Sequence, residues 1–312
     1  MEQLFKERAR NEIARIASRM AGSVGLCAIH VESDQRILLN SDRLFALAST
    51  YKIPIAIQLL KLVQQGRCSL EQMIEITTED LSPGSGVIKE LFTIPGVQLS
   101  LRNILDLAIR FSDNTASDIV LRVAGGGDQV TEMLRQAAIQ EISVDRPARH
   151  ILCDFYGFSD LAPPQPWSLA RFRTRLRETT PLARKEAMEV FTRDPRDHGS
   201  PGAMASLLAR IQRGEFLDRT HAGLLLDLMR RCRTGPARLK GQLPVGTIVA
   251  HKTGSIEGLV VNDAGIIEMP ADRGHVAIAV MVESMERPEA ELELTIAQIA
   301  RTIYDAFLLS TD

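Results

Sequence analysis

Hydrophobic residues recur at helical spacing near both ends of the chain. Between Glu2 and Met20 they are three or four residues apart, or multiples of these, which predicts an amphipathic helix. The stretch from Glu289 to Phe307 has the same period and predicts a second amphipathic helix. Between these two helices the pattern changes from strand-like to helical and then back to strand-like.

Strand patterns lie next to both terminal helices. Leu26 to Val31 and Arg36 to Asn40 flank a short run of turn-forming residues, which predicts a hairpin. Three more runs with strand character follow in the C-terminal part: Thr247–Lys252, Leu259–Ile267 and His275–Val282. The residues from about 47 to 213 are mostly helical in pattern and are interrupted by Gly and Pro.

This order predicts an α+β fold with one antiparallel sheet assembled from both ends of the chain and an inserted all-helical lobe. Residues 1–46 and 214–312 are expected to form the sheet lobe, and residues 47–213 the helical lobe, with a ligand cleft between them. Pro54 would fall just beyond the first turn of a helix that starts near Ser49. We therefore expect a slight kink or a 3₁₀ start there.

Composition excludes several classes of partner. The net charge is −2 and aromatic residues make up 4% of the chain, so no basic-aromatic surface for nucleic acid is expected. The longest uncharged apolar run, Val276–Val282, is too short to span a bilayer. The first residues lack the apolar core of a signal peptide, so the sequence as given is expected to be cytoplasmic, or periplasmic or secreted if a leader was removed.

No metal or cofactor is expected. The six His residues show no ligand spacing, and the four Cys residues are scattered without a Cys-x-x-Cys pair. Free buried thiols are therefore expected at Cys27, Cys68, Cys153 and Cys232, with two disulfides as the alternative. The chain is expected to act as a monomer on a small-molecule substrate.

One short motif brings a hydroxyl and an amine together at the start of a predicted helix. The stretch Ser-Thr-Tyr-Lys at residues 49–52 is the only Ser-x-x-Lys in the sequence, and the helical pattern Ile53–Gln65 follows it. Free N–H groups and the positive end of the helix dipole favour negative charge at such a position. Lys52 projects from the same helical face as Ser49, which provides the parts of an activated serine nucleophile.

Two further motifs follow in order. Ser112-Asp113-Asn114 lies between two helical patterns, and Lys252-Thr253-Gly254 follows a strand-like run. Ser-x-x-Lys, Ser-Asp-Asn and Lys-Thr-Gly in this order are the signature set of class A β-lactamases and penicillin-binding proteins, and the chain resembles that family from about Ile13 onward. Supporting stretches are Ser82–Gly86, Asp194–Asp197, Ser200–Met204 and Asn262-Asp263. The resemblance implies a five-stranded sheet flanked by the terminal helices.

The resemblance also implies roles in acyl transfer. Ser49 would attack a carbonyl carbon and form an acyl-enzyme, and Lys52 would take its proton. Ser112 would relay a proton to the leaving amine, although it can also serve as the N-cap of the following helix. The backbone N–H groups of Ser49 and Ser255 would form the oxyanion hole.

The same resemblance implies the substrate-binding residues. Lys252, on an expected edge strand, would bind the substrate carboxylate together with Thr253 and Ser255, and its charge would help to keep Lys52 neutral. Gly254 would leave room for the substrate. Asn114 would hydrogen-bond the substrate amide, with a purely structural role in its loop as the alternative.

One departure from the family pattern affects deacylation. Class A enzymes carry a glutamate in an Asp-Arg-x-Glu stretch that activates the deacylating water, but the matching residues 145–148 end in Ala148, which cannot accept a proton. The family's next landmark, Arg-Asp, follows only at Arg196-Asp197, so the active-site loop, about 148–196, is expanded. Arg146 and Asp197 are expected to close its neck as an ion pair.

The expanded loop leaves two readings open. Either it forms a helical flap that supplies another carboxylate, or no water activator exists and the acyl-enzyme turns over slowly or passes to another nucleophile. The candidate carboxylates are Asp154, Glu178, Glu186, Glu189 and Asp194. The extra chain also contains Pro163-Pro164-Gln165-Pro166-Trp167 and the arginines Arg171, Arg173, Arg175 and Arg177, which are expected to form a solvated helix face.

The sequence therefore predicts a serine hydrolase that cleaves amide bonds through an acyl-enzyme, in the manner of class A β-lactamases but with slow deacylation. The missing glutamate favours an alternative, a penicillin-binding enzyme with D-Ala-D-Ala carboxypeptidase or esterase activity. A third hypothesis is a penicillin-binding sensor that is acylated and stops. The expected substrate is accordingly a β-lactam or an acyl-D-amino-acid peptide.

Overall fold

The chain folds into two compact units. The computed structural model describes residues 2–310 except 93, 95 and 162–165. The first unit contains Met1–Ile53, Leu134–Ser143 and Asp197–Asp312, and the second contains Pro54–Met133 and Val144–Arg196. The sequence predicted a sheet lobe and a helical lobe that divide between residues 46 and 47 and between residues 213 and 214. The two compact units have other bounds, and the division into lobes stays a prediction.

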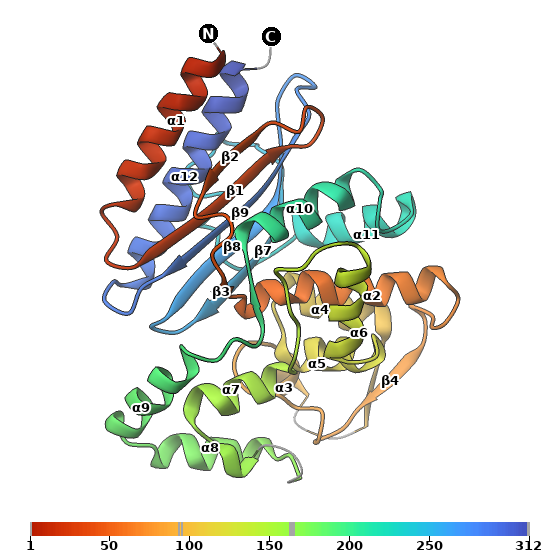
Figure 1. Cartoon of the computed structure of the whole chain (residues 1–312). Helices are drawn as coiled ribbons and strands as arrows, with labels where there is room; N and C mark the ends of the chain where they lie inside the picture. Colours follow the sequence, from red (N-terminus) through yellow and green to blue (C-terminus); the bar gives the residue numbers. More distant parts are fainter. Residues whose placement is uncertain (1, 93, 95, 162–165, 311–312) are drawn as a thin grey trace. The chain divides into compact units, whose positions relative to one another are not determined.

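A five-stranded antiparallel sheet forms the centre of the first unit (Figure 1). Its strands follow the order β2–β1–β9–β8–β7, so β7 is an edge strand. The bounds are β1 Ser23–His30, β2 Arg36–Leu39, β7 Val249–Ile256, β8 Val260–Glu268 and β9 His275–Glu283. The predicted hairpin and the three predicted C-terminal strands are confirmed, although their ends shift by a few residues.

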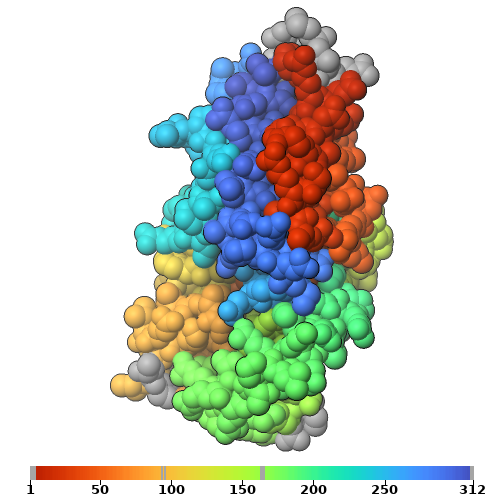
Figure 2. Space-filling model, turned by 90° about the vertical axis from the view of Figure 1, so that its left-hand side faces the viewer, coloured from red at the N-terminus to blue at the C-terminus, as the bar shows by residue number. Residues whose placement is uncertain are grey.

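Helices cover both faces of this sheet. α1 (Glu2–Ala17) and α12 (Glu289–Ser310) lie side by side on one face, and α10 (Pro201–Gln212) and α11 (Arg219–Arg230) lie on the other (Figure 1). Figure 2 shows the red α1 and the blue α12 covering the first of these faces. The expected arrangement, a five-stranded sheet flanked by the terminal helices, is confirmed.

The burial of the central strand follows from this layering. Successive side chains of a strand point to opposite faces, yet β9 is buried continuously along Val276–Val282 because helices lie on both sides. On the face of the terminal helices, Ile13 of α1 and Ile296 of α12 belong to one apolar core with Leu26 and Val280 of the sheet. Val249 of the edge strand β7 belongs to the same core.

Residues 45–51 lie between the N-terminal hairpin and helix α2. β3 (Phe45–Ala46) pairs with β6 (His198–Gly199), and the 3₁₀ turn η1 (Ala48–Tyr51) runs directly into α2 (Lys52–Gln64). Pro54 is the third residue of α2, where its missing N–H has no helical partner to lose. The predicted 3₁₀ start is confirmed by η1. Because the α-helix begins only at Lys52, Pro54 lies within its first turn rather than just beyond it.

The described residues of the second unit form helices and one small two-stranded ribbon. Strands β4 and β5 form an antiparallel pair that the sequence did not predict. The elements before the expanded loop, beyond α2, are β4 (Met73–Ile76), α3 (Ile88–Leu91), β5 (Val97–Ser100), α4 (Leu101–Arg110), α5 (Asn114–Val123) and α6 (Gly127–Gln136), the last of which ends in the first unit.

The expanded loop is itself folded. It contains α7 (Ala148–Tyr156), the 3₁₀ turn η2 (Ser159–Leu161), α8 (Leu169–Glu178) and α9 (Pro181–Phe191). Its small core consists of Cys153, Phe158, Leu161 and Phe172, with Leu152, Tyr156 and Trp167 packed against it. The four arginines of α8 are exposed, as predicted for a solvated helix face. Pro163–Gln165 lie outside the described residues.

All four cysteines are free, so the prediction of free thiols is confirmed, but the predicted burial is wrong for Cys68 and Cys232. Cys27 and Cys153 are buried, whereas Cys68 and Cys232 are only partly buried. Burial raises the pKa of Cys27 and of Cys153 to about 12, which leaves both thiols protonated and unreactive. Within the described part of the chain, no helix is long and apolar enough to cross a membrane.

Candidate active site

Ser49 lies in the first turn of a helix whose entry is fixed by hydrogen bonds. The Leu47 carbonyl accepts the Thr50 N–H at 3.2 Å and the Thr50 hydroxyl at 2.6 Å. Ala48 between them has a φ of 47°, a left-handed conformation that costs a residue other than glycine about 1–2 kcal/mol. Ser49 is partly exposed, whereas Lys52 is buried. An accessible hydroxyl and a buried amine therefore share the start of this helix.

Strand β7 lies directly against this turn at Gly254. A Cβ atom at residue 254 would lie 2.7 Å from the Leu47 oxygen, 2.9 Å from the Thr50 nitrogen and 3.0 Å from the Ser49 nitrogen. Such distances exclude a side chain, so only glycine lets the strand come this close. The contact places Ser255, the next strand residue, beside the Ser49 backbone. Room for the substrate, the reason given for Gly254 from the sequence, stays a prediction.

Asn262 ties the same turn to the neighbouring strand. It pairs with Gly254 in the β7–β8 register, and its side-chain amide donates to Ala46 O at 2.9 Å and to Leu47 O at 3.2 Å. The side chain is fully buried. Because Gly254 has no side chain, the amide of Asn262 can reach the chain that precedes Ser49. The sequence marked Asn262 only as part of a supporting stretch and did not assign it this contact.

Lys252 is buried on the edge strand. Its exposed fraction is 0%, and its ammonium donates to Thr253 O at 2.8 Å. Burial lowers the pKa of Lys252 to about 8; Arg238 adds to this effect, while Cys232 and Asp263 oppose it. Burial of the Lys252 charge, which is expected to bind a substrate carboxylate, therefore destabilises the folded protein.

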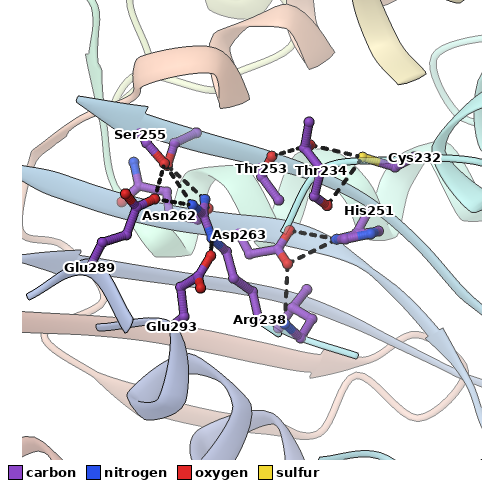
Figure 3. A network of polar contacts seen from close by, with 12 residues as sticks. Cys232, Thr234, Arg238, His251, Thr253, Ser255, Asn262, Asp263, Glu289 and Glu293 are labelled. Carbon is purple, nitrogen blue, oxygen red and sulfur yellow. Dashed lines mark hydrogen bonds and ion pairs between the residues drawn. The ribbon is translucent and has the colours of Figure 1, made fainter. Parts of the chain in front are cut away.

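Polar contacts fix the side chains on either side of Lys252 (Figure 3). Thr253 Oγ1 lies 2.5 Å from Thr234 Oγ1, which in turn lies 3.3 Å from Cys232 Sγ. His251 Nδ1 lies 2.9 Å from Asp263 Oδ2, and both side chains are buried. The hydroxyl of Thr253 therefore has a defined orientation before any substrate binds.

Arg238 is the main site residue that the sequence analysis missed. It lies between α11 and β7, is buried, and donates to Ser255 Oγ at 2.7 Å. It also forms ion pairs with Glu289 and Glu293 of α12 at 2.9 and 3.0 Å (Figure 3). No motif surrounds Arg238 in the sequence, and its partners lie far along the chain, so no local signal could have revealed it.

In the second unit, Ser112 immediately precedes the cap of α5. Its φ is 56°, and its carbonyl accepts the Ser85 hydroxyl at 2.8 Å. The N-cap of α5 is Asp113, whose Oδ1 accepts the Ala116 N–H at 2.9 Å. The suggestion that Ser112 caps this helix is therefore wrong. Asp113 is a better N-cap than Ser112 because its second oxygen, Oδ2, also accepts the N–H groups of Val87 and Ile88.

Asn114 holds the same loop. Its side-chain nitrogen donates to Pro83 O at 2.8 Å, and its backbone N–H donates to Ser85 O at 3.0 Å. The side chain is buried, with 7% exposed. These contacts agree with the structural role that the sequence analysis gave as the alternative, while binding of a substrate amide stays a prediction.

Ala148, at the position of the expected glutamate, begins α7. Asp118 of α5 accepts the N–H groups of Ala148 at 2.6 Å and Arg149 at 3.2 Å, and the Ser82 hydroxyl at 2.6 Å. Burial raises the pKa of Asp118, against the effect of these three hydrogen bonds. Asp118 thus caps α7 from another helix, and the sequence analysis did not foresee this role.

Arg146 is paired within the second unit. Its Nη1 binds Asp194 Oδ2 at 2.7 Å and also binds Asp154, and Arg196 binds the same two carboxylates. Burial alone would raise the pKa of Asp194, but hydrogen bonds from Arg196 and the charges of Arg146 and Arg196 lower it overall. The predicted pair of Arg146 with Asp197, which belongs to the first unit, stays a prediction.

The candidate replacements for the glutamate fall into two groups. Asp154 and Asp194 both form ion pairs with Arg146 and Arg196. The lowered pKa of Asp194 makes that carboxylate a weaker base. Glu178, Glu186 and Glu189 are exposed on α8 and α9. No carboxylate of this set therefore combines burial with freedom from an arginine partner, the setting in which a general base is usually found.

The predicted site residues are divided between the units. The first unit holds Ser49, Lys52, Asp197, Lys252, Thr253, Gly254 and Ser255, and the second holds Ser112, Asn114, Arg146 and Ala148. Within the first unit, the structure brings the Ser49 backbone, Gly254 and Ser255 together. The union of both sets in one active site stays a prediction.

The chain is similar over nearly its whole length to known proteins. Residues 8–307 match the model of the β-lactamase enzyme family. The β-lactamase VEB-1 of Pseudomonas aeruginosa is 28% identical over 305 residues, covering 95% of this chain and 89% of VEB-1. The crystal structure of a β-lactamase from Chitinophaga pinensis DSM 2588 is 30% identical, with a TM-score of 0.78 and coverage of 96% of this chain and 99% of that one.

A further similar structure comes from a penicillin-binding protein. A variant of PBP-A, in an acyl-enzyme complex with penicillin G, is 25% identical, with a TM-score of 0.75. The similarity covers 96% of this chain and 96% of the PBP-A chain.

Replacing Lys252 by Met should change stability in a pH-dependent way. The pKa of Lys252 is about 8 in the folded protein and 10.5 ordinarily, so burial of its charge destabilises the fold fully below pH 8 and ceases to do so as pH rises to 10.5. Lys252→Met should therefore gain up to about 3 kcal/mol more in unfolding free energy at pH 7 than at pH 10.5. Urea unfolding of both proteins at these pH values measures the difference; an equal effect at both would contradict the argument.

Replacing Asp118 by Ala should loosen the start of α7. Two buried donors and one partly buried donor lose their acceptor. Each unsatisfied buried group costs about 1–3 kcal/mol, so we expect a loss of roughly 2–4 kcal/mol after relaxation. Asp128→Ala, which alters an exposed carboxylate on α6, is the control and should cost no more than about 1 kcal/mol. Thermal unfolding gives the stability, and amide hydrogen exchange at Ala148 and Arg149 should quicken in the Asp118 variant alone. Unchanged protection of these two amides would refute the capping role.

Proposed function

Because the chain belongs to the β-lactamase enzyme family, we propose that it is a serine hydrolase that opens the amide bond of β-lactams through an acyl-enzyme on Ser49. One observation carries the choice of nucleophile. The partly exposed Ser49 starts a helix with the buried Lys52, and β7 lies against its backbone N–H at Gly254. A hydroxyl, a base and a donor for the oxyanion therefore meet at one residue.

Acylation uses residues that are all present. Ser49 Oγ attacks the carbonyl carbon while its proton passes to a neutral Lys52, and the N–H groups of Ser49 and Ser255 hold the oxyanion. Ser112 relays this proton from Lys52 to the ring nitrogen, the C–N bond breaks, and an ester remains on Ser49 while Lys52 returns to its neutral form. Lys252 orients the substrate through its carboxylate.

Deacylation lacks the carboxylate that would activate the water molecule. The methyl group of Ala148 replaces the carboxylate that would activate water, and the Asp118 carboxylate nearby is occupied by three hydrogen bonds. A positioned general base is worth about 10²–10⁴ in rate. We therefore propose that hydrolysis of the Ser49 ester is the slow step.

The same observation supports a second candidate function. Without a water activator, the acyl group can persist or pass to a nucleophile other than water, as in a penicillin-binding enzyme that acts on acyl-D-amino-acid peptides. The similarity to PBP-A, seen there as an acyl-enzyme with penicillin G, gives this alternative some support. The stability of the adduct and the product formed distinguish the two.

Ser49→Ala should abolish covalent labelling. Intact-mass spectrometry after mixing with penicillin G should reveal one adduct per wild-type chain and none on the variant, because the attacking oxygen is gone. Ser69→Ala, a substitution at an exposed serine, should label like the wild type. Undiminished labelling of the Ser49 variant would overturn the mechanism.

Ala148→Glu should speed the slow step. Wild-type turnover of nitrocefin should begin with a burst of one equivalent per active site, followed by a slow linear phase. The glutamate variant should raise the linear rate, by up to about 10²-fold if the carboxylate reaches the water. Ala148→Gln has the same shape without the base and should leave the linear rate unchanged. A wild-type trace with fast turnover and no burst would mean that another group activates water, and Glu186 and Glu189 would be the first to replace.

A further inference from the structure

All five N–H groups of Arg238 are in use. Its Nε donates to Glu293 Oε1 at 3.0 Å, and its Nη1 donates to Gly254 O at 3.1 Å and Asn262 O at 3.0 Å. Its Nη2 donates to Ser255 Oγ at 2.7 Å and to Glu289 Oε1 at 2.9 Å. A guanidinium carries five N–H groups, so no donor is left for a substrate anion (Figure 3).

Glu289 and Ser255 form one anion site with Arg238. Ser255 accepts a hydrogen bond from Arg238 and donates its own proton to Glu289 Oε1 at 3.3 Å. A single oxygen of Glu289 thus accepts both donors. Ser255 is also the hydroxyl expected to bind the substrate carboxylate, so that carboxylate and Glu289 would compete for the same partners.

Of the partners of Arg238, Glu289 can leave most easily. Its side chain is 55% exposed, against 22% for Glu293 and 5% for Arg238. The two carbonyl partners belong to the sheet and cannot move. An exposed ion pair is worth little, whereas a buried cation without compensation is costly. A carboxylate that displaces Glu289 would restore the charge balance, and a neutral group would not.

We propose that Glu289 is an internal anion that occupies the carboxylate site on Arg238 and Ser255 and gives way only to an anionic substrate. This inference rests on the proposed function, because it concerns the substrate carboxylate. Glu289 is then a specificity residue. It lowers the rate at which carboxylate-bearing substrates are captured and does not affect neutral ones.

The test compares a substrate with its neutral form. The second-order rate constant for acylation is measured with a cephalosporin and with its methyl ester, on the wild type and on Glu289→Gln and Glu289→Ala. Both variants should capture the free acid about three- to tenfold faster, and the gain should shrink at high salt. The ester should change less than twofold.

A control on the same helix distinguishes competition by Glu289 from the effect of a change in net charge. Glu291→Gln removes an exposed carboxylate of α12 that pairs with Arg287, so it changes the net charge equally. It should leave both rate constants unchanged. Slower acylation of the variants by the free acid, or an equal change for acid and ester, would overturn the proposal. Either result would mean that Glu289 positions Arg238 and does not compete with the substrate carboxylate.

A binding measurement keeps the proposal testable if acylation fails. Absence of a Ser49 adduct on the wild type with either substrate would overturn the proposed function, not the competition. Phenylacetate can then be titrated while the Arg238 Nε–H is followed by ¹⁵N NMR. Several-fold tighter binding to Glu289→Gln than to the wild type supports the inference, and equal affinity contradicts it.

Discussion

The approach of strand β7 to the Ser49 turn is the constraint on which the candidate site depends. It requires the absence of a side chain at residue 254, where even a Cβ would lie within 3.0 Å of three backbone atoms. Asn262 then reaches over this gap to two carbonyls before Ser49 and holds the turn in place. The strained φ of Ala48 persists because hydrogen bonds fix the neighbouring backbone, so Ser49, the proposed nucleophile, lies on a rigid turn.

The edge of the sheet that carries this contact is also where buried positive charge collects. Lys252 and Arg238 are both buried, and each is balanced by carboxylates, Asp263 near Lys252 and the α12 pair Glu289 and Glu293 around Arg238. In the proposed function these charges stay neutralised until a substrate anion arrives. The capture that we propose would then depend on α12, at the far end of the sequence from Ser49.

The elements of the fold that depend on local periodicity or on a short motif could be predicted from the sequence. Strand β9 and helix α12 follow from spacing. The 3₁₀ start before Pro54 was predicted because an α-helix that began at Ser49 would need the N–H that Pro54 lacks. Ser112 and Asp113 are both good caps, and only the backbone conformation, left-handed at Ser112 and extended at Asp113, decides between them. Arg238 was out of reach because its role arises from partners about fifty residues away. The same applies to Asp118, whose partners are Ser82 and the first two residues of α7.

The central claim is that an ester on Ser49 has its carbonyl in a hole formed by the N–H groups of Ser49 and Ser255. The infrared carbonyl band of the acyl-enzyme, formed with a ¹³C-labelled penicillin, tests this most directly. Hydrogen bonds to the oxygen weaken the C=O bond, so the band of the folded acyl-enzyme should lie at a clearly lower frequency than that of the same ester after denaturation in an aprotic solvent. A band at the same frequency in both states, or no ester band at all, would contradict the account.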